Sequence, residues 1–174
     1  MSRRARCVAL LPVVTCLALT APAPPGAPAG ADRSAEALVG SLYAAVTFEP
    51  GRPPDWDHVR SMFIEEAVIV LRTSRDATTI FTVDGFVDDF VSFIEQANAG
   101  QTGFTERVVR MKSIVFGDMA QVLVLYEASI PGSPRPPQPG VDGFSLIRRD
   151  GRWRIVSVTN EVPGPDRPLP ALLR

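Results

Sequence analysis

The feature that most constrains this chain is a pair of consecutive β-hairpins in its last part. Residues 107–130 alternate apolar and polar side chains around a turn at Gly117-Asp118, and residues 144–162 do so around Asp150-Gly151. An Asp-Gly pair between such segments favours a type I′ turn, because both central residues of that turn need a positive φ. The sequence therefore predicts a long antiparallel sheet in this part of the chain.

Helical periodicity precedes the hairpins. Apolar residues recur every three or four positions in three segments, and residues that can cap a helix stand before the first two, Ser34 and Asp55. A short apolar and β-branched segment at residues 67–73 is typical of a buried strand. The expected helices cover residues 35–48 and 56–63 and run from Asp84 to Gly100 or Gly103.

The order of these elements predicts an α+β domain. Helix, helix, strand and helix are followed by four strands, so we expect three N-terminal helices packed on a strongly curved, antiparallel or mixed β-sheet. Residues 32–162 form this domain, with proline-rich irregular connections at residues 49–55 and 131–140. Residues 163–174 contain four prolines and are expected to be an extended or disordered tail.

Residues 1–31 are typical of an export signal followed by an alanine- and proline-rich segment. Three arginines precede an apolar run at residues 7–19, which is shorter than the roughly 20 residues that span a bilayer. Residues 29–31 (AGA) fit the small-x-small cleavage pattern, and cleavage there leaves Asp32 as the N-terminus. We therefore expect an exported protein, secreted or held in the periplasm or cell envelope, that meets the membrane only transiently through its signal.

This segment leaves three alternatives open. The apolar run is also compatible with an uncleaved anchor. Arg3-Arg4 is compatible with the twin-arginine route, although Arg6-Cys7 stands where such signals usually carry apolar residues. Cys16 faintly resembles a lipoprotein acylation site, although the residue before it, Thr15, suits such a site poorly.

Cysteine content and charge exclude several classes of function. Both cysteines, Cys7 and Cys16, lie inside the predicted signal, so the mature chain has no disulfide, thiol nucleophile or cysteine metal site. Without the three signal arginines, the 18 basic and 19 acidic residues become 15 and 19, and no basic patch for nucleic acid remains. A transition-metal site would need mostly carboxylates because there is one histidine, so neither a metal nor a cofactor is expected.

Short motifs spread over nearly all of residues 34–162 carry a family resemblance. They are residues 56–59 (WDHV), 62–63 (MF), 67–68 (AV), 104–107 (FTER), 116–120 (FGDMA), 126–127 (YE), 143–145 (GFS) and 151–156 (GRWRIV). With the order of the elements, they resemble the nuclear transport factor 2-like superfamily of cone-shaped, cystatin-like α+β folds. Scytalone dehydratase, ketosteroid isomerase and polyketide cyclases share this fold.

The resemblance implies a pocket between the helices and the concave face of the sheet. Enzymes of the superfamily place Asp, His or Tyr side chains there to move protons beside an apolar substrate, since burial brings the pKa values of carboxyl and imidazole groups towards neutrality. Polar residues that strand or helix periodicity brings near that face are candidates to line the pocket. They are His58, Arg72, Glu106, Tyr126 and Asn160.

Each candidate also has a purely structural interpretation. His58, the single histidine, lies near the edge of an apolar helix stripe and suits the surface or the pocket rim. Arg72 and Glu106 can form an ordinary cross-strand ion pair. Glu127 lies on the face opposite Tyr126, where it is either a surface residue or an inward carboxylate that needs an arginine beside it. Asp88-Asp89 indicates a solvated helix face.

Two hypotheses from different classes follow. In the first, an exported domain binds a small apolar molecule in its pocket, with proton transfer, dehydration or cyclisation as the chemistry that the resemblance implies. In the second, the domain is a non-enzymatic module that forms a homodimer or docks on a partner through the face of its sheet. Whether the protein is an enzyme is left open, because the sequence has no glycine-rich phosphate loop, Gly-x-Ser-x-Gly elbow or His-Glu-x-x-His helix.

Overall fold

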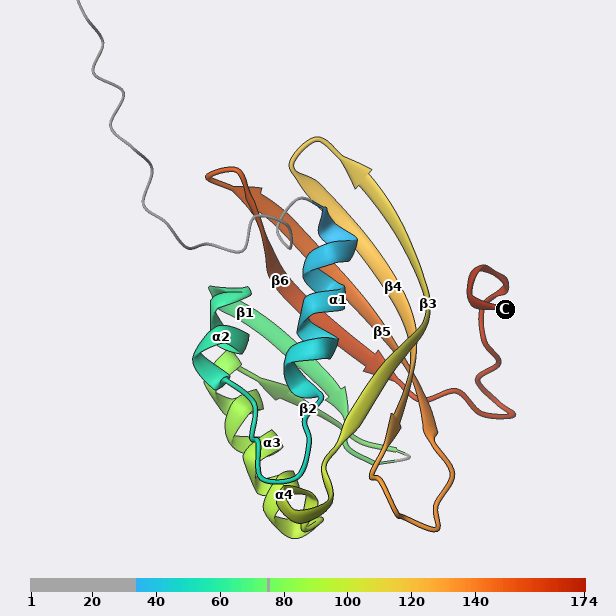
Figure 1. Cartoon of the computed structure of the whole chain (residues 1–174). Helices are drawn as coiled ribbons and strands as arrows, with labels where there is room; N and C mark the ends of the chain where they lie inside the picture. Colours follow the sequence, from blue (N-terminus) through green and yellow to red (C-terminus); the bar gives the residue numbers. More distant parts are fainter. Residues whose placement is uncertain (1–33, 75) are drawn as a thin grey trace, which may run out of the picture.

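The computed structural model describes residues 34–74 and 76–174, so the predicted signal at residues 1–31 lies outside the described residues. Helices and strands follow one another in an α+β order, and α1 crosses the concave face of a curved sheet (Figure 1). The elements are α1 (Ala35–Val46), α2 (Trp56–Ser61), β1 (Phe63–Arg72), β2 (Thr78–Phe81), α3 (Val83–Gln96), α4 (Ala99–Thr102), β3 (Thr105–Phe116), β4 (Met119–Ser129), β5 (Gln138–Arg149), β6 (Arg152–Glu161) and the 3₁₀ turn η1 (Ala171–Leu173).

The six strands form one mixed sheet in the order β2-β1-β6-β5-β4-β3. Neighbouring strands are antiparallel except β1 and β6, which run parallel. The predicted fold class, an α+β domain with helices packed on a mixed β-sheet, is therefore confirmed. We call the face towards α1 the inner face, and it carries Val122, Val124 and Tyr126 of β4; the opposite, outer face carries Leu123 and Leu125.

Local turn and capping chemistry explains why these elements begin and end where they do. Asp150 and Gly151 have φ values of 50° and 74°, as the predicted type I′ turn between β5 and β6 requires. Ser34 accepts a hydrogen bond from the Ala37 amide at 3.1 Å, and Asp55 accepts one from the His58 amide at 3.0 Å. These side chains satisfy amides in the first turns of α1 and α2, as the sequence predicted.

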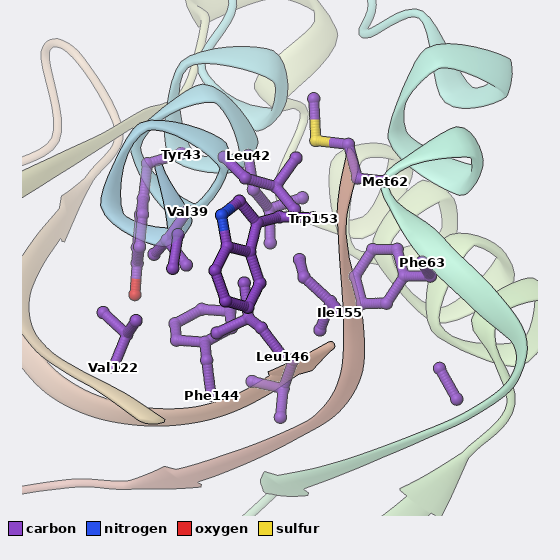
Figure 2. Close-up of a cluster of buried hydrophobic side chains, with 14 of the residues drawn as sticks. Val39, Leu42, Tyr43, Met62, Phe63, Val122, Phe144, Leu146, Trp153 and Ile155 are labelled. Carbon is purple, nitrogen blue, oxygen red and sulfur yellow. The ribbon is translucent and has the colours of Figure 1, made fainter. Parts of the chain in front are cut away.

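The core lies between α1 and the inner face of the sheet. Figure 2 shows Trp153 and Ile155 of β6 beside Phe144 of β5, all facing Leu42 and Tyr43 of α1. Trp153 and Ile155 are 3% and 0% exposed, so the aromatic residue in the closing hairpin is a core residue. Burial of these large side chains is the main source of stability for a domain without disulfides.

Several predicted boundaries are wrong in detail. The first helix ends at Val46, and the second ends at Ser61, because Phe63 already begins β1. The third helix begins at Val83, since Thr82 is its N-cap and accepts a hydrogen bond from the Gly85 amide at 3.1 Å. It ends before Asn98, whose φ of 53° breaks the helix ahead of both predicted glycines. The short elements β2 and α4 were not predicted, and β5 extends into the segment expected to be irregular.

The C-terminal residues fold back on the sheet, which differs from the extended or disordered tail that the prolines indicated. Leu173 in η1 is 1% exposed, and η1 contacts β3. The Arg110 guanidinium of β3 also donates a hydrogen bond to the carbonyl of Arg174. Leu125, which lies opposite Arg110 in the β3–β4 register, is 8% exposed although it belongs to the outer face. An apolar anchor near the chain end therefore overrides the local preference of the prolines.

Candidate functional site

An apolar cavity lies between the helices and the inner face of the sheet. Its volume is about 520 Å³, and α1, α3, β1, β3, β4, β5 and β6 all contribute side chains to it. Aromatic rings make up much of the wall, because α3 presents its phenylalanines towards the sheet at helical spacing. These rings are Phe86, Phe90 and Phe93 of α3, with Phe63, Phe104 and Phe144.

One part of the wall is polar and is held together by hydrogen bonds. The Tyr43 hydroxyl of α1 donates to Oδ2 of Asp142 at 2.5 Å. The Asn160 amide nitrogen donates to Oδ1 of Asp142 at 2.7 Å and to the Tyr126 hydroxyl oxygen at 3.0 Å. Asp142 and Asn160 lie opposite each other in the β5–β6 register, so the sheet itself places this pair. Because the Tyr126 oxygen is an acceptor here, its own hydrogen is available to a bound molecule.

Glu106 adds a second carboxyl group to the cavity wall. Its backbone is fixed at the end of α1, since its amide donates to the Thr47 hydroxyl at 2.9 Å and its carbonyl accepts from that hydroxyl at 3.1 Å. The Glu106 side chain has no hydrogen bond or ion pair with any residue that the structure describes. A carboxyl group held in this way is expensive to ionise unless a ligand provides a partner.

The two carboxyl groups hold their protons with different strength. Burial, and then the nearby charge of Asp142, raise the pKa of Glu106 to about 8. Burial also raises the pKa of Asp142, but hydrogen bonds from Tyr43 and Asn160 oppose the rise and leave it at about 6. Burial and the charge of Asp142 raise the pKa of both Tyr43 and Tyr126 well above the usual range. Near neutral pH, Glu106 is therefore mainly a carboxylic acid, whereas Asp142 is mainly a carboxylate.

Gly140 allows Tyr126 to lie across the sheet. The two residues face each other in the β4–β5 register, and the tyrosine ring covers the glycine. A Cβ atom on Gly140 would lie 2.3 Å from both Cζ and the hydroxyl oxygen of Tyr126, a distance that cannot exist without displacement of the ring. The missing side chain at position 140 therefore creates the space from which Tyr126 reaches Asn160.

Arg72 stands at the edge of the cavity and is bound by a carboxylate outside it. Its Nε and Nη2 atoms bind Oε1 and Oε2 of Glu161 at 3.0 and 2.5 Å. The pair predicted from the sequence, Arg72 with Glu106, is therefore wrong, because the parallel pairing of β1 with β6 brings Glu161 to Arg72. Glu127 forms a partly exposed ion pair with Arg107 at 2.6 Å, which agrees with its interpretation as a surface residue.

The structure brings Arg72, Glu106, Tyr126 and Asn160 to one cavity wall and leaves His58 apart. His58 is exposed on α2 and is not one of the residues that line the cavity. His58 is therefore a surface residue, which was its structural interpretation, and we no longer consider it a pocket residue. Asp89, expected on a solvated helix face, is exposed and also lies at the cavity lining.

Two central residues of the site were missed from the sequence. Tyr43 follows Val39 by one helical turn, so it lay beside the apolar stripe that the first helix presented. Asp142 lies between the segment expected to be irregular, residues 131–140, and the hairpin expected from residue 144, so no element was predicted for it. Its alternation with Phe144 and Leu146 is the signal that identifies it as an inner-face residue.

Other types of site are not formed by the described residues. Within residues 34–74 and 76–174, no group of three or more His, Cys, Asp or Glu side chains is arranged to hold a metal ion. No helix in this part of the chain is long and apolar enough to cross a membrane.

The sequence matches no protein-family model and no curated protein. Solved structures are nevertheless similar to it. A nuclear transport factor 2-like protein of unknown function from Pseudomonas putida KT2440 has a TM-score of 0.58 and 12% identity, over 74% of this chain and 83% of that one. A candidate scytalone dehydratase from Novosphingobium aromaticivorans has a TM-score of 0.56 and 11% identity, over 74% and 81%.

A third similar structure is described as an association domain. It is a candidate association domain of a calcium/calmodulin-dependent protein kinase type II from Thiobacillus denitrificans, with a TM-score of 0.56 and 15% identity over 76% of this chain and 98% of that one. At such identities the similarity concerns the fold alone. The curved sheet, its covering helices and these similar structures agree with the sequence motifs: the chain has the nuclear transport factor 2-like fold.

Proposed function

We propose that this protein binds a small, largely apolar molecule in the cavity between α1, α3 and the inner face of the sheet. The observation that carries the proposal is the cavity itself, whose volume of about 520 Å³ falls within the roughly 300 to 1,000 Å³ of small-molecule sites. Its aromatic and aliphatic wall provides apolar contact area. Its polar groups are few and lie together, as in sites that orient one end of a ligand.

Replacing Ala128 with Phe should weaken binding at least tenfold. Ala128 lines the cavity opposite Glu106 in the β3–β4 register, so a ring at this position occupies the ligand's space. Titration calorimetry with 1-naphthalenemethanol, a neutral apolar probe, measures the effect. Ala171→Phe adds the same ring at an exposed position in η1 and should bind like the wild type. A folded Ala128→Phe variant that keeps the wild-type affinity would contradict the proposal.

The proposal also includes proton transfer to and from the bound molecule. Between pH 6 and pH 8, Glu106 can give a proton to a bound molecule while Asp142 can accept one, because their pKa values lie at about 8 and about 6. The Tyr126 hydroxyl adds a neutral hydrogen-bond donor beside them. If carboxyl titration by NMR gave both groups ordinary pKa values near 4, this chemistry would be lost and only binding would stand.

A second candidate function is association with another copy of the chain. Four apolar side chains, Ile114, Phe116, Met119 and Ile147, share the outer face near the β3–β4 turn and are 75%, 80%, 53% and 37% exposed. We call them the outer-face patch. Exposed apolar side chains that adjoin in this way favour a protein contact. The structural similarity to a kinase association domain supports the same interpretation.

Phe116→Glu should convert a dimer formed through the outer-face patch into a monomer in sedimentation velocity. Phe116 is the most exposed member of the patch, and a charge there would be buried in the contact. Val162→Glu introduces the same charge at an exposed apolar residue just after β6, so it should leave the dimer intact. If the wild-type protein is a monomer at all concentrations, the association function is wrong.

Export is also part of the proposal, and it rests on the sequence pattern of residues 1–31 alone. Cleavage after Ala31 should yield a product whose first residue is Asp32. Mass spectrometry of the protein recovered outside the cytoplasm tests this, since an intact N-terminus would indicate an uncleaved anchor and an added lipid at Cys16 would indicate a lipoprotein.

A further inference from the structure

The ionisable groups on the cavity wall are mainly acidic. Within the described residues, the lining contains three carboxyl side chains, Asp89, Glu106 and Asp142, and one guanidinium, Arg72. The Nε and Nη2 atoms of Arg72 bind Glu161, a carboxylate that is not part of the lining. The cavity wall therefore contains more acidic groups than basic ones, and a positively charged ligand would favour their ionised forms.

No cationic side chain among residues 34–74 and 76–174 forms a hydrogen bond or ion pair with the two inner carboxyl groups, Glu106 and Asp142. Asp142 receives hydrogen bonds from the neutral groups of Tyr43 and Asn160, and Glu106 has no side-chain partner among the described residues. Asp142 is close enough to Glu106 for its charge to oppose the ionisation of Glu106. A buried carboxylate is stabilised most by a positive charge within the same low-dielectric space, which gains several times more there than in water.

The walls around these carboxyl groups are of the kind that accepts cations. Phe86, Phe90 and Phe93 line the cavity from α3, and Tyr126 lines it from β4. The face of an aromatic ring carries negative electrostatic potential and attracts an ammonium group, and more strongly when water is excluded. The aromatic rings and the carboxyl groups of this cavity therefore both favour a positive charge on a ligand.

We propose that the molecule held in this cavity is a monocationic amine, with an apolar body against the phenylalanines of α3 and its ammonium group between Glu106 and Asp142. This inference rests on the proposed binding function and narrows its ligand class. An apolar anion is disfavoured, because its charge would meet the two carboxyl groups. A neutral alcohol binds through the Tyr126 hydroxyl but leaves both carboxyl groups without a counter-charge.

A charge series on one ring system tests the inference. 1-Naphthylmethylamine, 1-naphthalenemethanol and 1-naphthoate share a ring and differ in charge from positive through neutral to negative. Titration calorimetry at pH 7 should give the amine an affinity at least tenfold higher than that of the alcohol, with naphthoate weakest. Glu106→Gln and Asp142→Asn should each weaken the amine at least fivefold and change the affinity for the alcohol less than twofold.

Matched controls separate this inference from the binding function itself. Asp88→Asn removes an exposed carboxylate of α3 that does not line the cavity, so it should leave all three affinities unchanged. If Asp142→Asn disturbs the network with Tyr43 and Asn160, Glu106→Gln still decides, because Glu106 has no side-chain bonds to lose. An alcohol that binds as tightly as the amine would overturn the inference and leave the binding function standing. If none of the three probes binds, both are wrong.

Discussion

Replacing Glu106 with Gln should raise the free energy of unfolding at alkaline pH by on the order of 2 to 3 kcal/mol. Burial keeps the pKa of this side chain at about 8 in the folded protein, against an ordinary value of 4.5. Each pKa unit corresponds to about 1.4 kcal/mol, and water in the cavity screens part of that effect. Glutamine has the same shape and does not ionise, so it avoids the cost of a buried negative charge.

The sign of the pH dependence follows from the direction of the shift. Folding raises the pKa of Glu106 from 4.5 to about 8. Below pH 4.5 the group is protonated in both states, and the stability of the folded protein is then fully retained. As the pH rises towards 8, the unfolded chain loses this proton while the folded protein keeps it, so the free energy of unfolding falls. Asp142, with a folded pKa of about 6, adds a smaller loss at lower pH. The wild type should therefore be less stable at pH 9 than at pH 5.5, whereas Glu106→Gln should lose less stability over this range.

Urea unfolding at half-unit pH intervals from 5.5 to 9 measures this difference. The range stops at 9 because tyrosines of the unfolded chain begin to ionise above that pH, and Tyr43 and Tyr126 then add their own dependence. Glu65→Gln removes an exposed carboxylate of β1 and should follow the wild-type curve. Parallel curves for the wild type and Glu106→Gln would show that Glu106 ionises normally in the folded protein.

Gly140→Ala should destabilise the protein by on the order of 1 to 3 kcal/mol, the usual cost of forcing an extra carbon into a packed site. The added Cβ would meet the ring and hydroxyl of Tyr126 at 2.3 Å, so the ring must leave its place over β5. Its hydroxyl then loses the hydrogen bond from Asn160. The same substitution should therefore also alter ligand binding, since Tyr126 lines the cavity.

A double-mutant cycle isolates this contact. With Tyr126→Ala as the background, Gly140→Ala should cost almost nothing, because the atoms that it would meet are gone. Gly164→Ala is the matched control, since a Cβ at that glycine meets no atom within 4 Å and its φ is not positive. Equal costs of Gly140→Ala with and without the Tyr126 ring would mean that the strain lies in the backbone of β5.

Features that depend on neighbouring residues could be predicted from the sequence. The Asp150-Gly151 turn needs only two adjacent residues that tolerate positive φ, and it forms as expected. The caps at Ser34 and Asp55 depend on amides three residues away. Strand alternation also made Glu106 and Tyr126 candidates for the inner face, because successive side chains of a strand point to opposite faces, and both residues line the cavity.

Features that depend on pairing between distant strands could not be predicted in this way. The partner of Arg72 is Glu161, because β1 joins β6 and not the strand that carries Glu106. Likewise, Asp142 meets Tyr43 only because α1 crosses the inner face above β5. Alternation gives the face of a residue but not its neighbour across the sheet, so the hydrogen-bonded network of the site required the structure.

The parallel pairing of β1 with β6 has a consequence for biosynthesis. β6 is the last of the six strands in chain order, yet it lies between β1 and β5 and joins the two parts of the sheet. Until residues 152–161 are available, β1 and β2 have no partner in the rest of the sheet, and Trp153 and Ile155 are missing from the core. A nascent chain therefore completes this sheet only after β6 has left the ribosome, because the longest-range contacts of the domain form last.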